Sequence, residues 1–135
     1  MASGSCVCGN ITYQYTGSPA LKAICHCLDC QHWSGSSGIS NVVVPTSAFS
    51  VTKGTPKAYT RTAASGMDHV MFFCDNCGSS LYSQAVSMAG TTLIKAGSLD
   101  GNASDISPVA IEFFTKDRPA YALPISGAQQ AKTME

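Results

Sequence analysis

The chain has little charge and no long apolar run. Only 12% of its 135 residues are charged, and eight basic residues balance eight acidic ones. A chain without an excess of positive charge does not attract phosphate backbones or anionic lipids, so we expect no nucleic-acid partner. No segment approaches the ~18 consecutive apolar residues of a membrane-spanning helix, so we also expect no membrane partner.

An export signal is also missing. The residues Met1-Ala2-Ser3-Gly4-Ser5 contain neither the basic nor the apolar region of a signal peptide. We therefore expect a cytoplasmic protein, in a compartment where thiols remain reduced. The cysteine count agrees, because seven cysteines in a secreted protein would leave one thiol without a disulfide partner.

Helical periodicity is scarce. The helical windows are a turn after Cys27 and residues 46–49 after Pro45, and neither is long enough for a packed helix. The rest of the chain alternates with a period of two, in short segments rich in β-branched and aromatic residues and bounded by Gly, Pro or Ser. This pattern predicts an all-β domain, with strands at residues 10–15, 39–44, 57–62, 69–73, 92–96 and 108–114.

The cysteines fall into three tight groups. Thiolates one or two residues apart cannot easily form a disulfide with each other, but they can bind one zinc ion at about 2.3 Å. Seven sulfurs suffice for one closed four-sulfur site and a second site that lacks one ligand. A closed site stabilises a fold and an open one does chemistry, so we expect two Zn²⁺ ions per chain, one structural and one functional. The groups are Cys6 and Cys8; Cys25, Cys27 and Cys30; and Cys74 and Cys77.

The residue after each group indicates which groups share a metal. A glycine follows the first and third groups (Gly9 and Gly78), whereas Gln31 follows the second. Glycine permits the left-handed turn that directs backbone N–H groups toward a thiolate. This favours one site made by the first and third groups and a three-sulfur site made by the second. The alternative, in which the first two groups share a site, stays open because spacing alone does not determine which loops meet.

Two histidines lie close to the second group. His26 stands between Cys25 and Cys27, so an extended backbone places its imidazole on the face opposite the two sulfurs. It is either hydrogen-bonded to nearby backbone or a general acid or base. His32, two residues past Cys30, is either an exposed loop histidine or a group that reaches the open metal position.

Two further features are candidates for binding a ligand. Ser34, Gly35 and Ser36 form a turn just after the second group, and the backbone N–H groups of such a turn can receive a peptide or a carboxylate; a plain turn is the alternative. Arg61 belongs to a sparse basic cluster, which is either a solvated strand face or a site of anion recognition.

Taken in order along the chain, these motifs are specific to one family. They comprise residues 4–13 around the first group, the second group with residues 34–36, residues 73–79 around the third group, residues 96–100 and a late Pro108. Over about residues 4–121 the chain resembles the glutathione-dependent formaldehyde-activating enzyme family, which also includes the centromere protein V type proteins.

The resemblance implies a Mss4-like fold of several coiled antiparallel β-sheets with zinc knuckles and little helix. It also implies a carbon–sulfur lyase that acts on S-(hydroxymethyl)glutathione, with glutathione as cosubstrate. Carried over by position, the first and third groups match the structural zinc site, and the second group matches the site that handles glutathione. The ligands so implied are Cys6, Cys8, Cys74 and Cys77 for the first zinc, and Cys25, Cys27 and Cys30 for the second.

Residues and resemblance together predict a single zinc-binding catalytic domain at residues 1–125 and a flexible tail at residues 126–135, which has no hydrophobic pattern. We hypothesise a zinc-dependent lyase for glutathione conjugates or hemithioacetals, in which zinc stabilises the substrate thiolate. The partner is then a small-molecule thiol or thiol conjugate, while the oligomeric state, a homodimer included, stays open. The alternative is a non-catalytic zinc-binding scaffold or chaperone-like module of the Mss4 type. The candidate catalytic residues are Cys25, Cys27, Cys30, His26 and His32, and the candidate glutathione-binding residues are Ser34, Gly35, Ser36 and Arg61.

Overall fold

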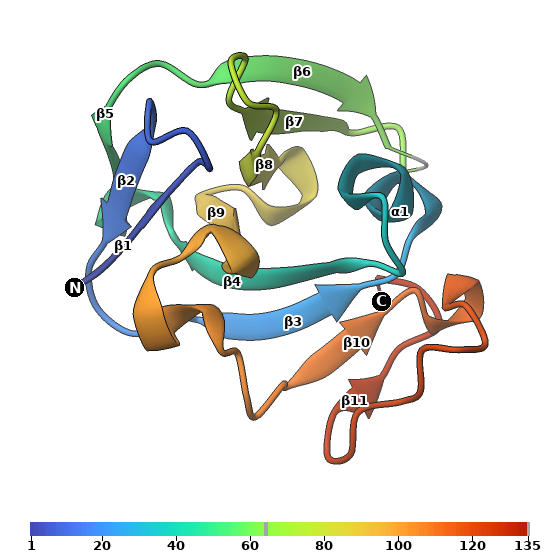
Figure 1. Ribbon diagram of the computed structural model, residues 1–135. Coiled ribbons are helices and arrows are strands. Elements are labelled where there is room, and N and C mark those ends of the chain that lie inside the picture. The colour runs from blue at the N-terminus through green and yellow to red at the C-terminus, as the bar shows by residue number, and fades with distance from the viewer. Residues whose placement is uncertain (64, 135) are drawn as a thin grey trace.

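The computed structural model describes residues 1–63 and 65–134 (Figure 1). In these residues two sheets form the fold, one of three strands in the order β1-β2-β5 and one of eight strands in the order β11-β10-β3-β4-β9-β8-β7-β6. Neighbouring strands are antiparallel except that β10 runs parallel to both β3 and β11. The strands are β1 (Ala2–Ser5), β2 (Thr12–Tyr15), β3 (Leu21–Cys25), β4 (Ile39–Pro45), β5 (Phe49–Lys53), β6 (Lys57–Thr62), β7 (Asp68–Phe73), β8 (Ser80–Ala85), β9 (Thr91–Lys95), β10 (Ile111–Phe113) and β11 (Gln129–Gln130).

Helical structure is short. Within the described ranges there is one α-helix, α1 (Leu28–Ser34), and it lies on the opposite side of the molecule from the small sheet (Figure 1). No helix in this part of the chain is long and apolar enough to cross a membrane. The 3-10 turns are η1 (Thr46–Ala48), η2 (Val86–Met88), η3 (Ala96–Ser98), η4 (Gly101–Ser104) and η5 (Thr115–Asp117).

The predicted all-β class is confirmed, and each predicted strand segment contains a strand. The pattern misses β1, β3, β5, β8 and β11. In β8 the reason is that Leu81, Tyr82 and Ser83 are buried in succession, with exposures of 0%, 5% and 0%. A strand covered on both faces does not alternate between apolar and polar residues, so a period of two cannot identify it.

An aromatic row joins the two sheets. The ring of Tyr13 on β2 lies 5.4 Å from that of Phe49 on β5, and Phe49 lies 4.6 Å from Tyr82 on β8. Tyr82 in turn stacks on Phe72 of β7, with centroids 4.5 Å apart. Aromatic pairs at these spacings contribute beyond the burial of their area, so this row fixes the small sheet against the large one.

The segment after residue 125, for which the sequence predicts a flexible tail, contains a strand. Within it, β11 pairs with β10 in parallel, Ala131 is buried, and the Gln130 side-chain amide donates to the Glu112 carboxylate at 2.6 Å. A two-residue strand held by its backbone and one amide leaves no hydrophobic pattern in the sequence, which is why the pattern fails here.

Candidate metal centres

Four cysteines from two distant loops meet at one place and form the four-cysteine set. Cys6 and Cys8 follow β1, whereas Cys74 and Cys77 lie in the turn between β7 and β8. Their Sγ atoms all lie within 4.8 Å of one another, with 3.5 Å from Cys6 to Cys8 and 3.7 Å from Cys8 to Cys74. An S–S bond is only about 2.05 Å long. Four sulfurs about 2.3 Å from one ion would be roughly 3.8 Å apart, so the set has the spacing of a closed tetrahedral site.

The two loops of this set have the same local structure. Gly9 and Gly78 both have positive φ, 77° and 79°, as the sequence predicts for the residue after each cysteine pair. The N–H of Gly9 donates to the carbonyl of Cys6 at 3.1 Å, and that of Gly78 to the carbonyl of Cys74 at 2.8 Å. A side chain at such a φ is strained, so glycine is what permits each turn to fold around its sulfurs.

Hydrogen bonds to the sulfurs stabilise their ionised form. The N–H of Ile11 donates to Cys6 Sγ at 3.3 Å, and the Ser79 hydroxyl lies 3.2 Å from Cys77 Sγ. The Ser79 hydroxyl, helped by backbone N–H groups, lowers the pKa of Cys77 to about 5. Ser79 also accepts from the N–H of Val7 at 3.0 Å and thereby joins the two loops.

The remaining cysteines form a separate three-cysteine set. Cys25 ends β3, Cys27 is the N-cap of α1, and Cys30 lies in the first turn of that helix. Their Sγ atoms lie within 4.8 Å of one another, and those of Cys27 and Cys30 are 3.0 Å apart. Of the two partitions that the sequence leaves open, the structure has the one in which the second group stands alone.

One of these sulfurs begins the helix. The N–H of Cys30 donates to Cys27 Sγ at 3.3 Å, so the thiol takes the acceptor position that Ser, Thr, Asp or Asn usually occupies at an N-cap. At the other end, Gly35 closes α1 with a φ of 67°. The turn predicted after Cys27 is therefore a short helix whose start is made by the candidate metal ligands themselves.

The three thiols do not ionise independently. The pKa of Cys27 is lowered to about 2, because the thiols of Cys25 and Cys30 and the Cys30 N–H donate hydrogen bonds to its sulfur. The hydrogen bond with Cys27 raises the pKa of Cys25 to about 11, against the opposing effect of Cys30, and the sulfurs of Cys25 and Cys27 both raise the pKa of Cys30. A divalent cation would stabilise all three thiolates together, so this donor set fits zinc.

Within the described ranges, the three-cysteine set has no fourth protein ligand. Among residues 1–63 and 65–134, no further Cys, His, Asp or Glu places a ligand atom in the same 4.8 Å group. Structural zinc sites are closed by four protein ligands, and catalytic ones keep a position for water or substrate. The two sets therefore differ in the property that separates a structural from a reactive metal.

Arg61 connects α1 to the large sheet beside this set. Its guanidinium on β6 donates to the carboxylate of Asp29 on α1 at 2.9 Å and to Nδ1 of His69 on β7 at 3.0 Å. Burial, and then the charge of Arg61, lower the pKa of His69 to about 4, so its imidazole is neutral at pH 7. Because Nδ1 accepts, the proton of the neutral ring is on Nε2.

His26 is buried and places no ligand atom in the three-cysteine set. Its Nε2 is 2.8 Å from Glu112 Oε1, and its Nδ1 is 3.2 Å from the carbonyl oxygen of Ser37. Both partners are acceptors, so the ring donates to both only as the imidazolium cation. Glu112 also accepts from the N–H of Ile125 and the amide of Gln130, at 2.9 and 2.6 Å. This network fixes the cysteine loop to β10 and the C-terminal segment.

The other predicted ligand-binding residues are less available than the sequence suggests. The Gly35 N–H donates to the carbonyl of Gln31 at 2.8 Å, and the Ser36 N–H donates to Ser34 Oγ at 3.1 Å. Both amides are thus used within the turn, and ligand binding by Ser34, Gly35 and Ser36 stays a prediction. His32 is exposed on α1 and belongs to neither cysteine set.

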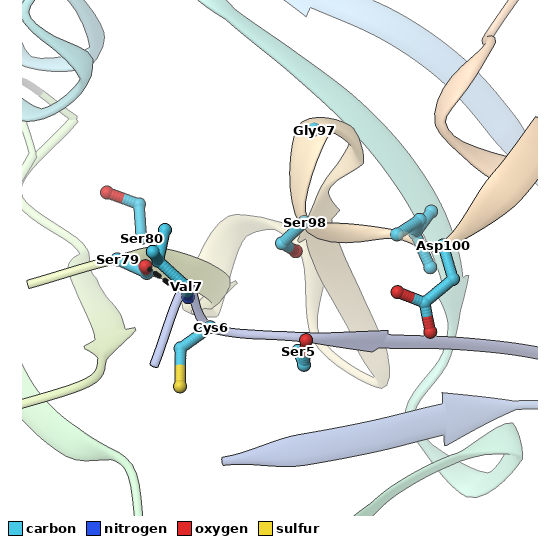
Figure 2. A pocket seen from close by; sticks show the side chains of 9 residues that line it. Ser5, Cys6, Val7, Ser79, Ser80, Gly97, Ser98 and Asp100 are labelled. Carbon is cyan, nitrogen blue, oxygen red and sulfur yellow. Dashed lines mark hydrogen bonds between the residues drawn. The ribbon is translucent and has the colours of Figure 1, made fainter. Parts of the chain in front are cut away.

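Two cavities adjoin the sets. One of about 480 Å³ runs from Cys6 to Asp100, and Figure 2 shows the Ser79–Val7 hydrogen bond at one end of it and the Asp100 carboxylate at the other. The second, of about 240 Å³, is lined by Ser34 and Lys95 among others. Ser80 lines both cavities, so they meet at this residue.

Two residues that organise this region were missed in the sequence. Glu112 and Lys95 are buried, with exposures of 1% and 7%. Each stands in a strand that is otherwise apolar or small, and Lys and Glu are almost never fully buried unless they are paired. A charged residue at an inward strand position was the signal that could have identified them.

Comparisons with known proteins agree with this architecture. A family model described as glutathione-dependent formaldehyde-activating enzyme matches residues 1–117. Among solved structures, the crystal structure of a Rhodobacter sphaeroides protein is similar with a TM-score of 0.62 and 20% sequence identity, over 79% of this chain and 96% of that chain. At that identity the likeness shows the fold alone. No curated protein gives a significant sequence match. The chain belongs to the glutathione-dependent formaldehyde-activating enzyme family.

Proposed function

We propose that this protein is a zinc-dependent carbon–sulfur lyase that acts on S-(hydroxymethyl)glutathione or on related conjugates and hemithioacetals of glutathione. The observation that carries the proposal is the contrast between a closed four-cysteine set and a three-cysteine set to which the described part of the chain adds no fourth ligand. Family membership supports glutathione and formaldehyde as the chemistry. Residues 1–125 would form the catalytic domain, and residues 126–134 would complete its sheet.

Each set has a distinct part in this proposal. The four-cysteine set would hold a zinc ion that joins a loop of the small sheet to a turn of the large one, and so would stabilise the fold. The three-cysteine set would hold the second ion. Zinc bound there supplies positive charge that keeps a substrate sulfur as a thiolate, which is both a nucleophile and a leaving group.

The lysis of a hemithioacetal needs few further groups. The carbon–sulfur bond breaks with its electron pair on sulfur, while the hydroxyl oxygen loses its proton and becomes the carbonyl of the aldehyde; the reverse step forms the same bond. His26 is buried, with both ring nitrogens engaged, so we assign it to positioning the loop that carries Cys25 and Cys27. We propose His32, which is exposed on α1, as the group that exchanges the proton with water.

Other side chains keep the helix in place during this reaction. Arg61 pairs with Asp29, the residue before Cys30, and thereby ties the first turn of α1 to β6. The side-chain amide of Gln31 donates to the carbonyls of His26 and Asp117, both at 2.9 Å. These bonds come from segments far apart in the sequence, so the three sulfurs keep one arrangement as the substrate enters and leaves.

Exchange NMR tests the proposal directly. With ¹³C-labelled formaldehyde and glutathione at equilibrium, the zinc-loaded protein should accelerate the interconversion of free aldehyde and S-(hydroxymethyl)glutathione above the spontaneous rate. The Cys30→Ser variant is the matched control, because it retains the four-cysteine set and should fold without accelerating exchange. Equal rates with and without the wild-type protein, for this and for other aldehydes, would leave the scaffold alternative.

A further inference from the structure

Among the residues that the structure describes, Lys95 is a buried cation without a carboxylate partner. It lies on β9 with 7% exposure, and its Nζ donates to Asn41 Oδ1 at 2.7 Å and to Ser83 Oγ at 2.9 Å. Both partners are neutral. In the described part of the chain no Asp or Glu lies within ion-pair distance of it. Burying an ammonium group is costly unless an anion compensates it, so this position calls for a negative charge.

The ammonium group has unused capacity for such a charge. It carries three N–H donors, and the two bonds to Asn41 and Ser83 use two of them. Trp33 lies on another side of the group, with its ring centroid 5.3 Å from Nζ. Burial lowers the pKa of Lys95 to about 8, which leaves the side chain mainly protonated at pH 7.

A cavity of about 240 Å³ is lined by Lys95 and by three serines, Ser34, Ser40 and Ser80. Within the described residues, the hydroxyls of Ser40 and Ser80 make no hydrogen bond, so they too can donate to a ligand. Pockets that enclose a whole drug-sized ligand measure about 300–1,000 Å³. This smaller cavity therefore suits one polar end of a ligand.

The residues that line the cavity are neighbours of the three-cysteine set, although none of the three cysteines lines it. Ile39, which lines it, is the register partner of Cys25 across β3 and β4. Ser34, on its other side, is the last residue of the helix that contains Cys30. A ligand whose sulfur lies at the cysteines can thus place a second group over Lys95.

We propose that this cavity is the carboxylate subsite of the thiol substrate. Lys95 Nζ pairs with a carboxylate of the substrate, and the hydroxyls of Ser40 and Ser80 donate hydrogen bonds to it. The inference rests on the proposed function insofar as it places a thiol at the three-cysteine set. It adds that the thiol must carry a carboxylate, and it identifies Lys95 as the residue that selects for one.

The alternative role for Lys95 is to offset the negative charge of the three thiolates. A comparison of the binding of acids with that of their esters distinguishes this role from the binding of a substrate carboxylate. Binding to the zinc-loaded protein is measured by calorimetry for glutathione against its glycine ethyl ester, and for 3-mercaptopropionate and 6-mercaptohexanoate against their methyl esters. Each pair shares one thiol and differs in one charge. A charge-assisted hydrogen bond in a buried site predicts that the wild type binds at least one acid about 10- to 100-fold more tightly than its ester.

Lys95→Met should remove this preference and weaken the acids to the level of their esters. Lys132→Met, at an exposed lysine on the C-terminal segment, should leave it unchanged, and Ser40→Ala with Ser80→Ala should reduce it. Equal binding of acid and ester by the wild type, or a preference that survives in Lys95→Met, overturns the proposal. If Lys95→Met fails to fold, the proposal is tested by the ratio of acid to ester affinity in the wild type and by the reduction of that ratio in the variant with Ser40→Ala and Ser80→Ala. A Lys95-dependent preference among mercaptoalkanoates without binding of glutathione would keep the subsite and contradict glutathione as the substrate.

Discussion

Cys77→Ser should damage the fold far more than the exposure of Cys77 suggests. This residue is exposed, and exposed substitutions usually change stability by less than about 0.5 kcal/mol. Structural zinc contributes about 10–16 kcal/mol in small zinc-binding domains. If four thiolates share that free energy equally, the loss of one costs about 3–4 kcal/mol, a large part of the ~5–15 kcal/mol that stabilises a domain.

The structure explains why this loss is global. Cys77 belongs to the turn between β7 and β8, and its metal partners Cys6 and Cys8 lie beside the small sheet. A weakened site therefore loosens the contact between the two sheets. Cys30→Ser affects a set whose members lie on β3 and the helix that follows it, so it should fold with much smaller damage.

Thermal unfolding measured with and without a zinc chelator separates metal loss from side-chain loss. For a chain of this length, 3–4 kcal/mol corresponds to a fall in Tm of roughly 10–15 °C. The Cys77→Ser variant should show that deficit in the zinc-loaded form, and the difference from wild type should disappear after chelation. Equal damage in Cys77→Ser and Cys30→Ser, or a deficit that persists without metal, would refute the division into structural and reactive sites.

Two further predictions concern the residues around the sets. Gly78→Ala should destabilise the protein by about 1 kcal/mol, because the alanine must adopt a φ of 79° although no atom crowds its Cβ. The control is Gly97→Ala, where the Cβ is equally free and φ is not positive. Both variants are compared with wild type by urea denaturation, and an equal loss of stability in the two would show that the positive φ of Gly78 is not the cause. Glu112→Gln should cost about 1–3 kcal/mol, since it removes the buried carboxylate that accepts from His26, the N–H of Ile125 and the amide of Gln130. The amide of Gln130, the N–H of Ile125 and His26 hold the pKa of Glu112 below its ordinary value of about 4.5, against the opposing effect of burial. The folded state therefore takes up this proton less readily than the unfolded state, so the contribution is complete above about pH 4.5 and is lost as the pH falls through the folded pKa. Urea midpoints measured from pH 7 to about pH 3 should fall less steeply below pH 4.5 in Glu112→Gln than in wild type, and parallel profiles would show that this carboxylate does not contribute.

The cysteine groups were predictable because the information lies within a few residues. Gly9 and Gly78 indicate the left-handed turns, and those turns indicate which pairs share a metal. The spacing of the second group likewise predicts that its three sulfurs face one point. Neither inference required knowledge of how the strands are ordered.

The surroundings of the three-cysteine set depend on long-range register and were not predictable in the same way. Lys95 reaches Asn41 because β4 and β9 are neighbours, and Glu112 reaches His26 because β10 runs beside β3. The parallel pairing of β10 with β3 and β11 is set by tertiary structure. The alternation of apolar and polar residues along a strand does not indicate which strand lies beside it. The same holds for the C-terminal segment, whose fixed position comes from Glu112 rather than from any pattern of its own.

The most direct test of two unlike metal sites is the visible spectrum of the cobalt-substituted protein during a titration with glutathione. We expect two metal ions per chain, with about half of the sulfur-to-cobalt charge-transfer absorption responding as the three-cysteine set gains a fourth sulfur, and the other half unchanged. In Cys30→Ser the responding half should be lost. One metal ion per chain, or a spectrum indifferent to glutathione and to its hydroxymethyl adduct, would contradict the account.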